Sequence, residues 1–282
     1  MDLFQAVLLG IVQGLTEFLP ISSSAHLRIV PALVGWQDPG AAFTAVIQIG
    51  TLVAVLAYFR RDIVRIGRAW TRGLAGGRPL GDPDARLGWM IIVGTVPIVA
   101  CGLVFRGHIE TTFRSLYVVA LALVALAVAL ALAEMLVRGR ARAGKRQKQL
   151  ADITWTDALA TGAAQALALV PGSSRSGVTI TAGLFAGMSR EAAARFSFLL
   201  SLPSVLAAGV FELYAARSEV LGSSKDVAAL VVATAAALVS GYAAIAFLLY
   251  YLRTHTTYVF VAYRLLLGGL LLYLLAAGRL AP

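Results

Sequence analysis

Long apolar runs separated by short polar segments dominate the chain. A transmembrane helix needs about 20 consecutive apolar residues, because the hydrocarbon core of a bilayer is about 30 Å thick. Windows of that length predict membrane-spanning helices near residues 40–59, 87–106, 115–137, 191–216, 227–252 and 258–279. The pattern therefore predicts an all-α polytopic membrane protein with about six transmembrane helices, in which residues 1–282 form a single integral membrane domain.

Two further apolar stretches, residues 2–36 and 154–187, are interrupted by proline, glycine and serine. Non-helical backbone at membrane depth is tolerated only where it is buried in protein or lines a water-filled cavity. We therefore predict that each stretch is a re-entrant helix pair, with a short helix, a polar break and a second short helix.

The two halves of the chain resemble each other. The peptide GIVQGL starting at Gly10 and the peptide GAAQAL starting at Gly162 share a glycine, a glutamine and a leucine. A proline and a serine cluster follow in both halves. We predict repeats over 1–137 and 154–282. An odd number of spans in each repeat would give the second repeat the opposite orientation in the membrane to the first. Such an inverted-topology repeat brings the two polar breaks together near the middle of the bilayer.

Composition and charge support a membrane protein and set its orientation. The chain is 59% hydrophobic and 13% charged, whereas soluble domains carry about 25% charged residues. The net charge is +10, but thirteen of the 24 Lys and Arg residues lie within 60–86 and 138–148. Two short basic segments indicate cytoplasmic loops, over 60–86 and 138–152, rather than a nucleic-acid site. The expected partner of these loops is the anionic inner leaflet of the membrane. With both loops in the cytoplasm and six spans, both termini are expected on the extracytoplasmic side.

The first break carries an unusual set of polar residues for a membrane segment. Gln13 and Glu17 are spaced i, i+4 on one helix face, and so are Ser22 and His26. An ionised carboxylate at membrane depth costs about 2.5–3.5 kcal/mol, so Glu17 needs a compensating partner. With Gln13 it would suit a hard cation such as Mg²⁺. In the alternative, Glu17 caps backbone amides and the serines satisfy the broken helix.

The second break, PGSSRSGVT from Pro171, predicts an anion site. Proline and glycine end one helix, and the start of the next presents free backbone N–H groups. Arg175 adds a cationic fork suited to phosphate. Hydroxyl donors come from Ser173, Ser174 and Ser176. In the alternative, Arg175 is only the structural partner of Glu17 in a buried ion pair.

Together the breaks supply an anion cradle, a hydroxyl nucleophile, a candidate base and a carboxylate. These groups suit phosphoryl transfer, in which positioning and charge neutralisation do most of the catalysis. A site inside the membrane suits a substrate with a lipid tail. The competing interpretation is an inverted-repeat lipid flippase or secondary transporter, which needs an anion cradle but no nucleophile. A structural assembly subunit is a third option, but it leaves the intramembrane Glu and Arg unexplained.

The peptides QGLTEFLPISSSAH and PGSSRSGVT resemble the two signature motifs of the bacterial undecaprenyl-pyrophosphate phosphatase family, the bacitracin-resistance type. The resemblance covers essentially the whole chain. It implies hydrolysis of the terminal phosphate of undecaprenyl pyrophosphate, which yields the carrier lipid for cell-wall synthesis. It also implies a divalent cation, Mg²⁺ or Ca²⁺, and a multi-pass protein of the bacterial cytoplasmic membrane whose site opens on the extracytoplasmic side.

The resemblance also implies roles for individual residues. Gln13 and Glu17 match a (Glu/Gln)-x-x-x-Glu element tied to metal and catalysis, although some members have Glu at the first position. Ser23 matches the proposed nucleophile, His26 the catalytic histidine and Arg175 the phosphate-binding arginine. Associated polar positions are matched by Ser22, Ser174 and Thr179. A water activated by Glu17 or His26 is the open alternative to Ser23, and the sequence does not decide whether the chain forms a homo-oligomer.

Overall fold

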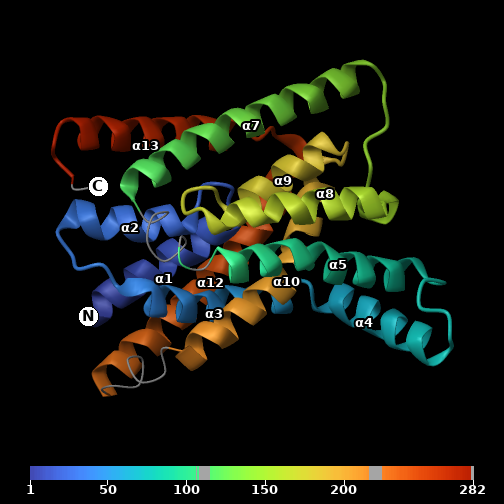
Figure 1. Ribbon diagram of the computed structural model, residues 1–282, viewed down its shortest axis with the longest axis horizontal. Coiled ribbons are helices and arrows are strands. Elements are labelled where there is room, and N and C mark those ends of the chain that lie inside the picture. The colour runs from blue at the N-terminus through green and yellow to red at the C-terminus, as the bar shows by residue number, and fades with distance from the viewer. Residues whose placement is uncertain (106, 108–114, 216–223, 281–282) are drawn as a thin grey trace.

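The computed structural model describes residues 1–105, 107, 115–215 and 224–280, and almost all of that chain is helical (Figure 1). The helices of the first half are α1 (Leu3–Phe18), α2 (Ser23–Val34), α3 (Gly40–Tyr58), α4 (Arg60–Ala75), α5 (Pro83–Val104) and α7 (Leu116–Arg142). The helices of the second half are α8 (Trp155–Gln165), α9 (Arg175–Phe185), α10 (Arg190–Ala215), α12 (Ser224–Thr254) and α13 (Tyr258–Ala276). Short 3₁₀ turns, η2 (Leu150–Asp152) and η3 (Ala166–Leu169), flank α8.

The all-α polytopic class is confirmed. Five helices are long and apolar enough to cross a membrane: α5, α7, α10, α12 and α13. The span predicted over 40–59 corresponds to α3, which continues into α4 through a bend of 77° and brings the total to six if that bent pair is one span. Parts of the connections after α5 and α10 lie outside the described residues.

Both predicted polar breaks separate two short helices. In the first half α1 has 16 residues and α2 has 12, and in the second half α8 and α9 have 11 each. At 1.5 Å per residue, none of these helices is as long as the hydrocarbon core is thick. The helix–break–helix pattern is therefore present in both halves, whereas their re-entrant course in the membrane stays a prediction.

The two halves pack in matched ways. Helix α1 lies against α12 and α8 against α5, while α3 contacts α12 and α10 contacts α5. Glycine allows close approach at equivalent places. An added Cβ would lie 2.2 Å from the Ala233 carbonyl oxygen at Gly10 and 2.2 Å from the Gly94 carbonyl oxygen at Gly162. These pairings are those expected of two related halves, and the inverted repeat itself stays a prediction that they support.

The prediction of a loop over 60–86 is wrong for its first part, which forms α4. Residues Ile63, Ile66 and Trp70 recur at helical spacing, and both Ile66 and Trp70 pack against Gly88 of α5. Arginines occupy the opposite face. A hydropathy window averages the two faces, so an amphipathic helix of this kind reads as a polar loop.

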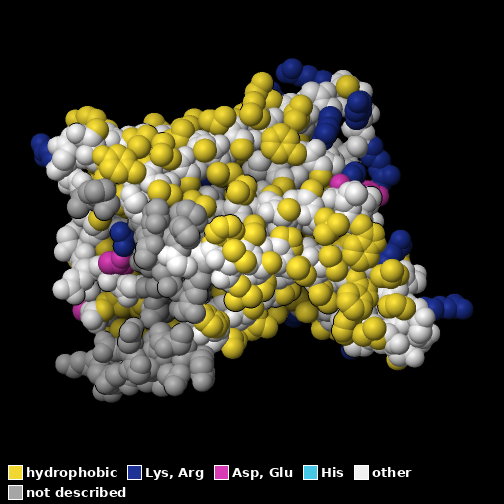
Figure 2. Space-filling model, in the orientation of Figure 1, with side chains coloured by type: hydrophobic (Ala, Val, Ile, Leu, Met, Phe, Trp, Pro, Cys, Tyr) yellow, Lys and Arg dark blue, Asp and Glu magenta, His cyan; other side chains and the backbone are white. Residues whose placement is uncertain are grey.

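The ends of the molecule differ in charge. Both termini lie at the left of Figure 1, whereas α4, the start of α5 and the end of α7 lie at the right. Most Lys and Arg side chains visible in Figure 2 gather at the right, and hydrophobic side chains cover the flank between the ends. This distribution is typical of a protein that spans a bilayer.

Candidate active site

The two breaks adopt the same backbone conformation. Ser22 has φ 77° and ψ 98°, and Ser174 has φ 70° and ψ 114°. They are the only non-glycine residues with positive φ in the described chain. A serine in this region of the Ramachandran plot is strained, and such strain is concentrated at functional sites.

Each of these serines also caps the helix that follows. Ser22 Oγ accepts a hydrogen bond from the backbone N–H of Ala25 at 3.4 Å, and Ser174 Oγ accepts one from Gly177 at 3.1 Å. The residue after each cap is the first residue of α2 or α9. The two equivalent positions hold Ser23 and Arg175, so the same turn presents a hydroxyl in one half and a guanidinium in the other.

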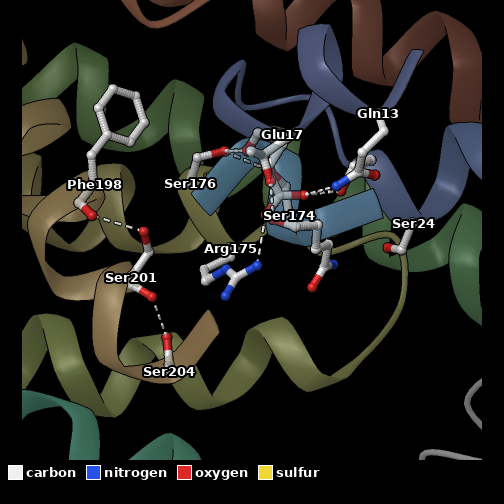
Figure 3. A network of polar contacts seen from close by, with 12 residues as sticks. Gln13, Glu17, Ser24, Ser174, Arg175, Ser176, Phe198, Ser201 and Ser204 are labelled. Atoms are coloured by element: carbon white, nitrogen blue, oxygen red, sulfur yellow. Dashed lines mark hydrogen bonds and ion pairs between the residues drawn. The ribbon is translucent and has the colours of Figure 1, made fainter. Parts of the chain in front are cut away.

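Ser23 and Arg175 meet on Glu17, and Figure 3 shows the contact with Arg175. Glu17 Oε2 accepts hydrogen bonds from Ser23 Oγ at 2.6 Å and from Gln13 Nε2 at 3.0 Å. Glu17 Oε1 accepts from Arg175 Nη2 at 2.6 Å. The Glu17 side chain is 8% exposed and the Arg175 side chain is 16% exposed. Three predicted site residues from both halves, Gln13, Ser23 and Arg175, therefore converge on the Glu17 carboxylate, which retains limited access from outside.

Two other serines join the breaks through the main chain. Ser176 Oγ lies 3.1 Å from the carbonyl oxygen of Glu17 and 3.2 Å from that of Leu19, to which it donates. The backbone N–H of Gly172 donates to Ser24 Oγ at 3.3 Å. Ser176 thus holds the two breaks together, and its contact with phosphate stays a prediction.

Two residues predicted to bind phosphate lie behind the second turn. The Thr179 hydroxyl is fully buried, donates to the Arg175 carbonyl oxygen at 2.7 Å and lies 2.6 Å from Ser197 Oγ of α10. Ser173 is also buried, and its carbonyl oxygen accepts hydrogen bonds from Arg264. Both residues support the turn from within, so direct contact with substrate stays a prediction for each.

The residue that sequence reasoning missed is Arg264 of α13. Its guanidinium is 1% exposed and donates to main-chain carbonyls of both breaks, at Pro20, Gly172 and Ser173. Further bonds reach two carbonyls of α7. A buried charge is tolerated when it is fully hydrogen-bonded, and here backbone dipoles provide the partners. The available signal was an arginine inside a predicted span, because ionisable residues there are usually functional.

His26 is held on both sides of its ring. Its Nδ1 lies 2.7 Å from the carbonyl oxygen of Ser22, and its Nε2 lies 2.5 Å from the hydroxyl of Tyr263. An Nδ1–H that donates to the carbonyl leaves Nε2 to accept from the tyrosine. The predicted Ser22–His26 contact therefore forms through the main chain, because the Ser22 hydroxyl caps α2. The catalytic role of His26 stays a prediction, and Tyr263 is a second residue that the sequence did not single out.

Gln13 and Glu17 also fit a cation. Gln13 Oε1 is buried and has no hydrogen-bond partner among the described residues, while the same amide binds Glu17 through its nitrogen. The described chain contains no cluster of three or more His, Cys, Asp and Glu residues that could hold a metal alone. Mg²⁺ is commonly bound by one or two carboxylates together with substrate phosphates. The donor set therefore suits a cation shared with a phosphate ligand.

Comparison with known proteins assigns the chain to a family. The family model described as "Bacitracin resistance protein BacA" matches residues 6–270. A Chlorobaculum tepidum protein named Undecaprenyl-diphosphatase is 61% identical over 282 residues, which is 100% of both chains. Proteins of the same name from Chlorobium limicola and Prosthecochloris aestuarii are 60% identical over 280 residues and 58% identical over 279, each covering 99% of both chains. The chain therefore belongs to the BacA family of bacitracin resistance proteins.

Proposed function

We propose that this chain is an undecaprenyl-pyrophosphate phosphatase, which removes the terminal phosphate and returns undecaprenyl phosphate for cell-wall synthesis. Full-length relatives at about 60% identity carry that name. The observation that carries the proposal is the meeting of Ser23 and Arg175 on Glu17, which places a hydroxyl, a base and an anion-binding cation together.

Arg175 is the group that receives the phosphate. Its guanidinium holds only one Glu17 oxygen, and a phosphate offers two oxygens to the same fork. Helices α2 and α9 both begin at the site. The free backbone N–H groups and the dipole at the start of each helix favour a negatively charged ligand. Substrate binding therefore draws Arg175 away from Glu17 and leaves the carboxylate bonded to Ser23.

Glu17 is then placed to act as the base. Ser23 Oγ already donates to Glu17 Oε2 at 2.6 Å, so its proton moves to the carboxylate as Oγ attacks the terminal phosphorus. The P–O bond to the lipid monophosphate breaks and undecaprenyl phosphate leaves. Water then attacks the phosphoserine, Glu17 returns the proton to Ser23 Oγ as the P–O bond to the serine breaks, and inorganic phosphate is released. His26 orients the turn, because both of its ring nitrogens are engaged by Ser22 and Tyr263.

A divalent cation, Mg²⁺ or Ca²⁺, would be held by the Glu17 carboxylate and Gln13 Oε1, and would neutralise pyrophosphate charge when bound. The orphaned Gln13 oxygen supports this assignment. The separation of the termini from the basic end supports a chain in the bacterial cytoplasmic membrane, with both termini outside. We place the opening of the site on that outer side, where the lipid pyrophosphate is released.

The test is phosphate release from undecaprenyl pyrophosphate in detergent, with metal or with chelator. Wild type is expected to release phosphate only with metal, and Arg175→Ala is expected to lose at least about 10²-fold in rate. Arg253→Ala is the matched control, because Arg253 is 59% exposed and pairs with Glu191 away from the breaks. Lipid translocation by the wild type without phosphate release would instead support the flippase alternative.

A further inference from the structure

The arginines of α4 line a surface groove that belongs to neither broken helix pair. The groove has a volume of about 600 Å³, and its lining residues are Arg60, Arg61, Val64, Arg65, Arg68, Ala69, Arg72, Asp82 and Asp84. Five arginines and two aspartates line it, an excess of three positive charges. A groove with this charge attracts an anionic ligand.

The local carboxylates are already engaged. Arg65 binds Asp62 at 3.2 Å and Asp84 at 3.2 Å. Asp62 also binds Arg195 of α10 at 2.8 Å. These ion pairs fix α4 against its neighbours and engage Asp62 and Asp84, while Asp82 caps α5 by accepting a hydrogen bond from the backbone N–H of Asp84.

Three arginines of the groove keep their charge available. Arg61, Arg68 and Arg72 are exposed, and in the part of the chain that the structure describes they have no carboxylate partner. Their spacing of seven and four residues places them along one side of α4. They form a row of guanidinium groups, and such forks bind phosphate oxygens in pairs.

The surroundings of the groove are those of a membrane–water boundary. Helix α4 follows the apolar α3 after the 77° bend. Val64, which lines the groove, is 49% exposed. The rings of Trp70 and Trp89 lie 5.4 Å apart between α4 and α5, and their indole N–H groups are buried. Tryptophans gather at the headgroup level of bilayers, so this pair is consistent with a position of α4 near that level.

We propose that this groove binds the phosphodiester headgroup of an anionic glycerophospholipid, with Arg61, Arg68 and Arg72 as the donors. Charge complementarity requires an anion, and the exposed Val64 beside the arginines fits an amphiphile better than free phosphate. Basic groups next to a membrane segment bind anionic lipids in this way. The inference is independent of the phosphatase proposal, because α4 contributes no residue to the Glu17 site.

The experiment measures binding of fluorescent phosphatidylglycerol and phosphatidylcholine to the full chain in neutral detergent. The test variant is the triple change Arg61→Gln, Arg68→Gln and Arg72→Gln. The matched control, Arg138→Gln, Arg142→Gln and Lys145→Gln, removes three charges from the end of α7 and the segment that follows it. Each charge is worth about fivefold in affinity for an anionic lipid. The groove variant should therefore lose phosphatidylglycerol at least about tenfold, while the control keeps wild-type affinity.

Several results would overturn the inference. They are equal binding of phosphatidylcholine, an equal loss in the control, unchanged binding in the groove variant, or displacement of the lipid by millimolar inorganic phosphate. Thermal unfolding in neutral detergent reports whether each variant is folded. If the triple variant does not fold, the single variants replace it, and a loss in each of them supports the groove whereas no loss in any contradicts it.

Discussion

Two buried carboxylate–arginine pairs stabilise this molecule, and they are built differently. Glu134 is fully buried, and its two oxygens accept hydrogen bonds from Arg190 and from the backbone N–H and hydroxyl of Thr257. Glu17 keeps 8% of its side chain exposed and binds Arg175 through a single nitrogen. The first pair is closed and joins α7 to the starts of α10 and α13. The second can be opened by a ligand that competes for the arginine.

The difference teaches how an ion pair in a membrane protein is used. A closed pair such as Glu134–Arg190, in which the carboxylate is fully buried and two nitrogens of the arginine bind it, locks helices together, and breaking it leaves a buried charge unpaired. The open pair lies beside Gln13 Oε1, a buried acceptor that has no hydrogen-bond partner among the described residues. Strained serine turns flank only the open pair. We therefore propose that the same two residue types serve stability in one place and chemistry in the other.

Removing the charge of Glu17 should have the largest effect on activity. Glu17→Gln is expected to lower kcat about 10³-fold, because an amide cannot accept the Ser23 proton and general-base catalysis contributes about 10²–10⁴-fold. The unfolding midpoint should fall less than in Glu134→Gln, since the amide can still bond to Ser23 and the Glu17 side chain is 8% exposed whereas that of Glu134 is fully buried. Phosphate release and thermal unfolding of the purified variant check both parts. Near-normal turnover would remove Glu17 from the mechanism.

Substitution of Arg264 should damage both breaks at once. Arg264→Met removes the donor shared by the carbonyl oxygens of Pro20, Gly172 and Ser173, and each buried carbonyl left without a donor costs about 1–3 kcal/mol. Arg264→Lys keeps the charge but not the fork of the guanidinium. We therefore expect an unfolding midpoint between those of wild type and Arg264→Met, with kcat reduced more than KM is raised. Arg279→Met, on the short segment after α13, is the control. A lysine variant with wild-type kcat would show that the fork does not position the site.

The matched change at the closed pair should leave chemistry nearly intact. Glu134→Gln is expected to lower the unfolding midpoint, because Arg190 loses its charged partner in a buried site. Its kcat per folded molecule should stay within about threefold of wild type, since the pair touches neither break. Thermal unfolding with kinetics on the same sample makes the comparison. If Glu134→Gln loses activity as strongly as Glu17→Gln, the distinction between the two pairs fails.

Local patterns predicted much of the fold and part of the site. Apolar run length and polar interruptions placed the spans and both breaks, and the i, i+4 spacing placed Gln13 beside Glu17. The meeting of Glu17 with Arg175 also followed from treating the breaks as one site. Arg264 and Tyr263 were missed because α13 reaches the breaks only through tertiary packing, which no local spacing encodes. The α4 helix was missed because its two faces cancel in a hydropathy average.

The hydroxyl groups of the site show the same limit of sequence-based prediction. Sequence identifies Ser176 and Thr179 as polar residues in a membrane segment, but not which partner each one takes. Ser176 binds carbonyls of the first break and Thr179 binds Ser197. Among the hydroxyl groups of the described residues, only that of Ser23 donates to the carboxylate that Arg175 also holds. Assignment of a nucleophile thus depends on geometry that spacing alone does not determine.

The most direct test of the mechanism is a single-turnover reaction with undecaprenyl pyrophosphate labelled in its terminal phosphate. The reaction is stopped with acid, and the digested protein is searched for labelled phosphate by mass spectrometry. We expect transient phosphoserine at Ser23, absent from Ser23→Ala and accumulating when water attack is slowed. Release of labelled phosphate at the wild-type rate by Ser23→Ala, with no label on the protein at any time, would contradict the account.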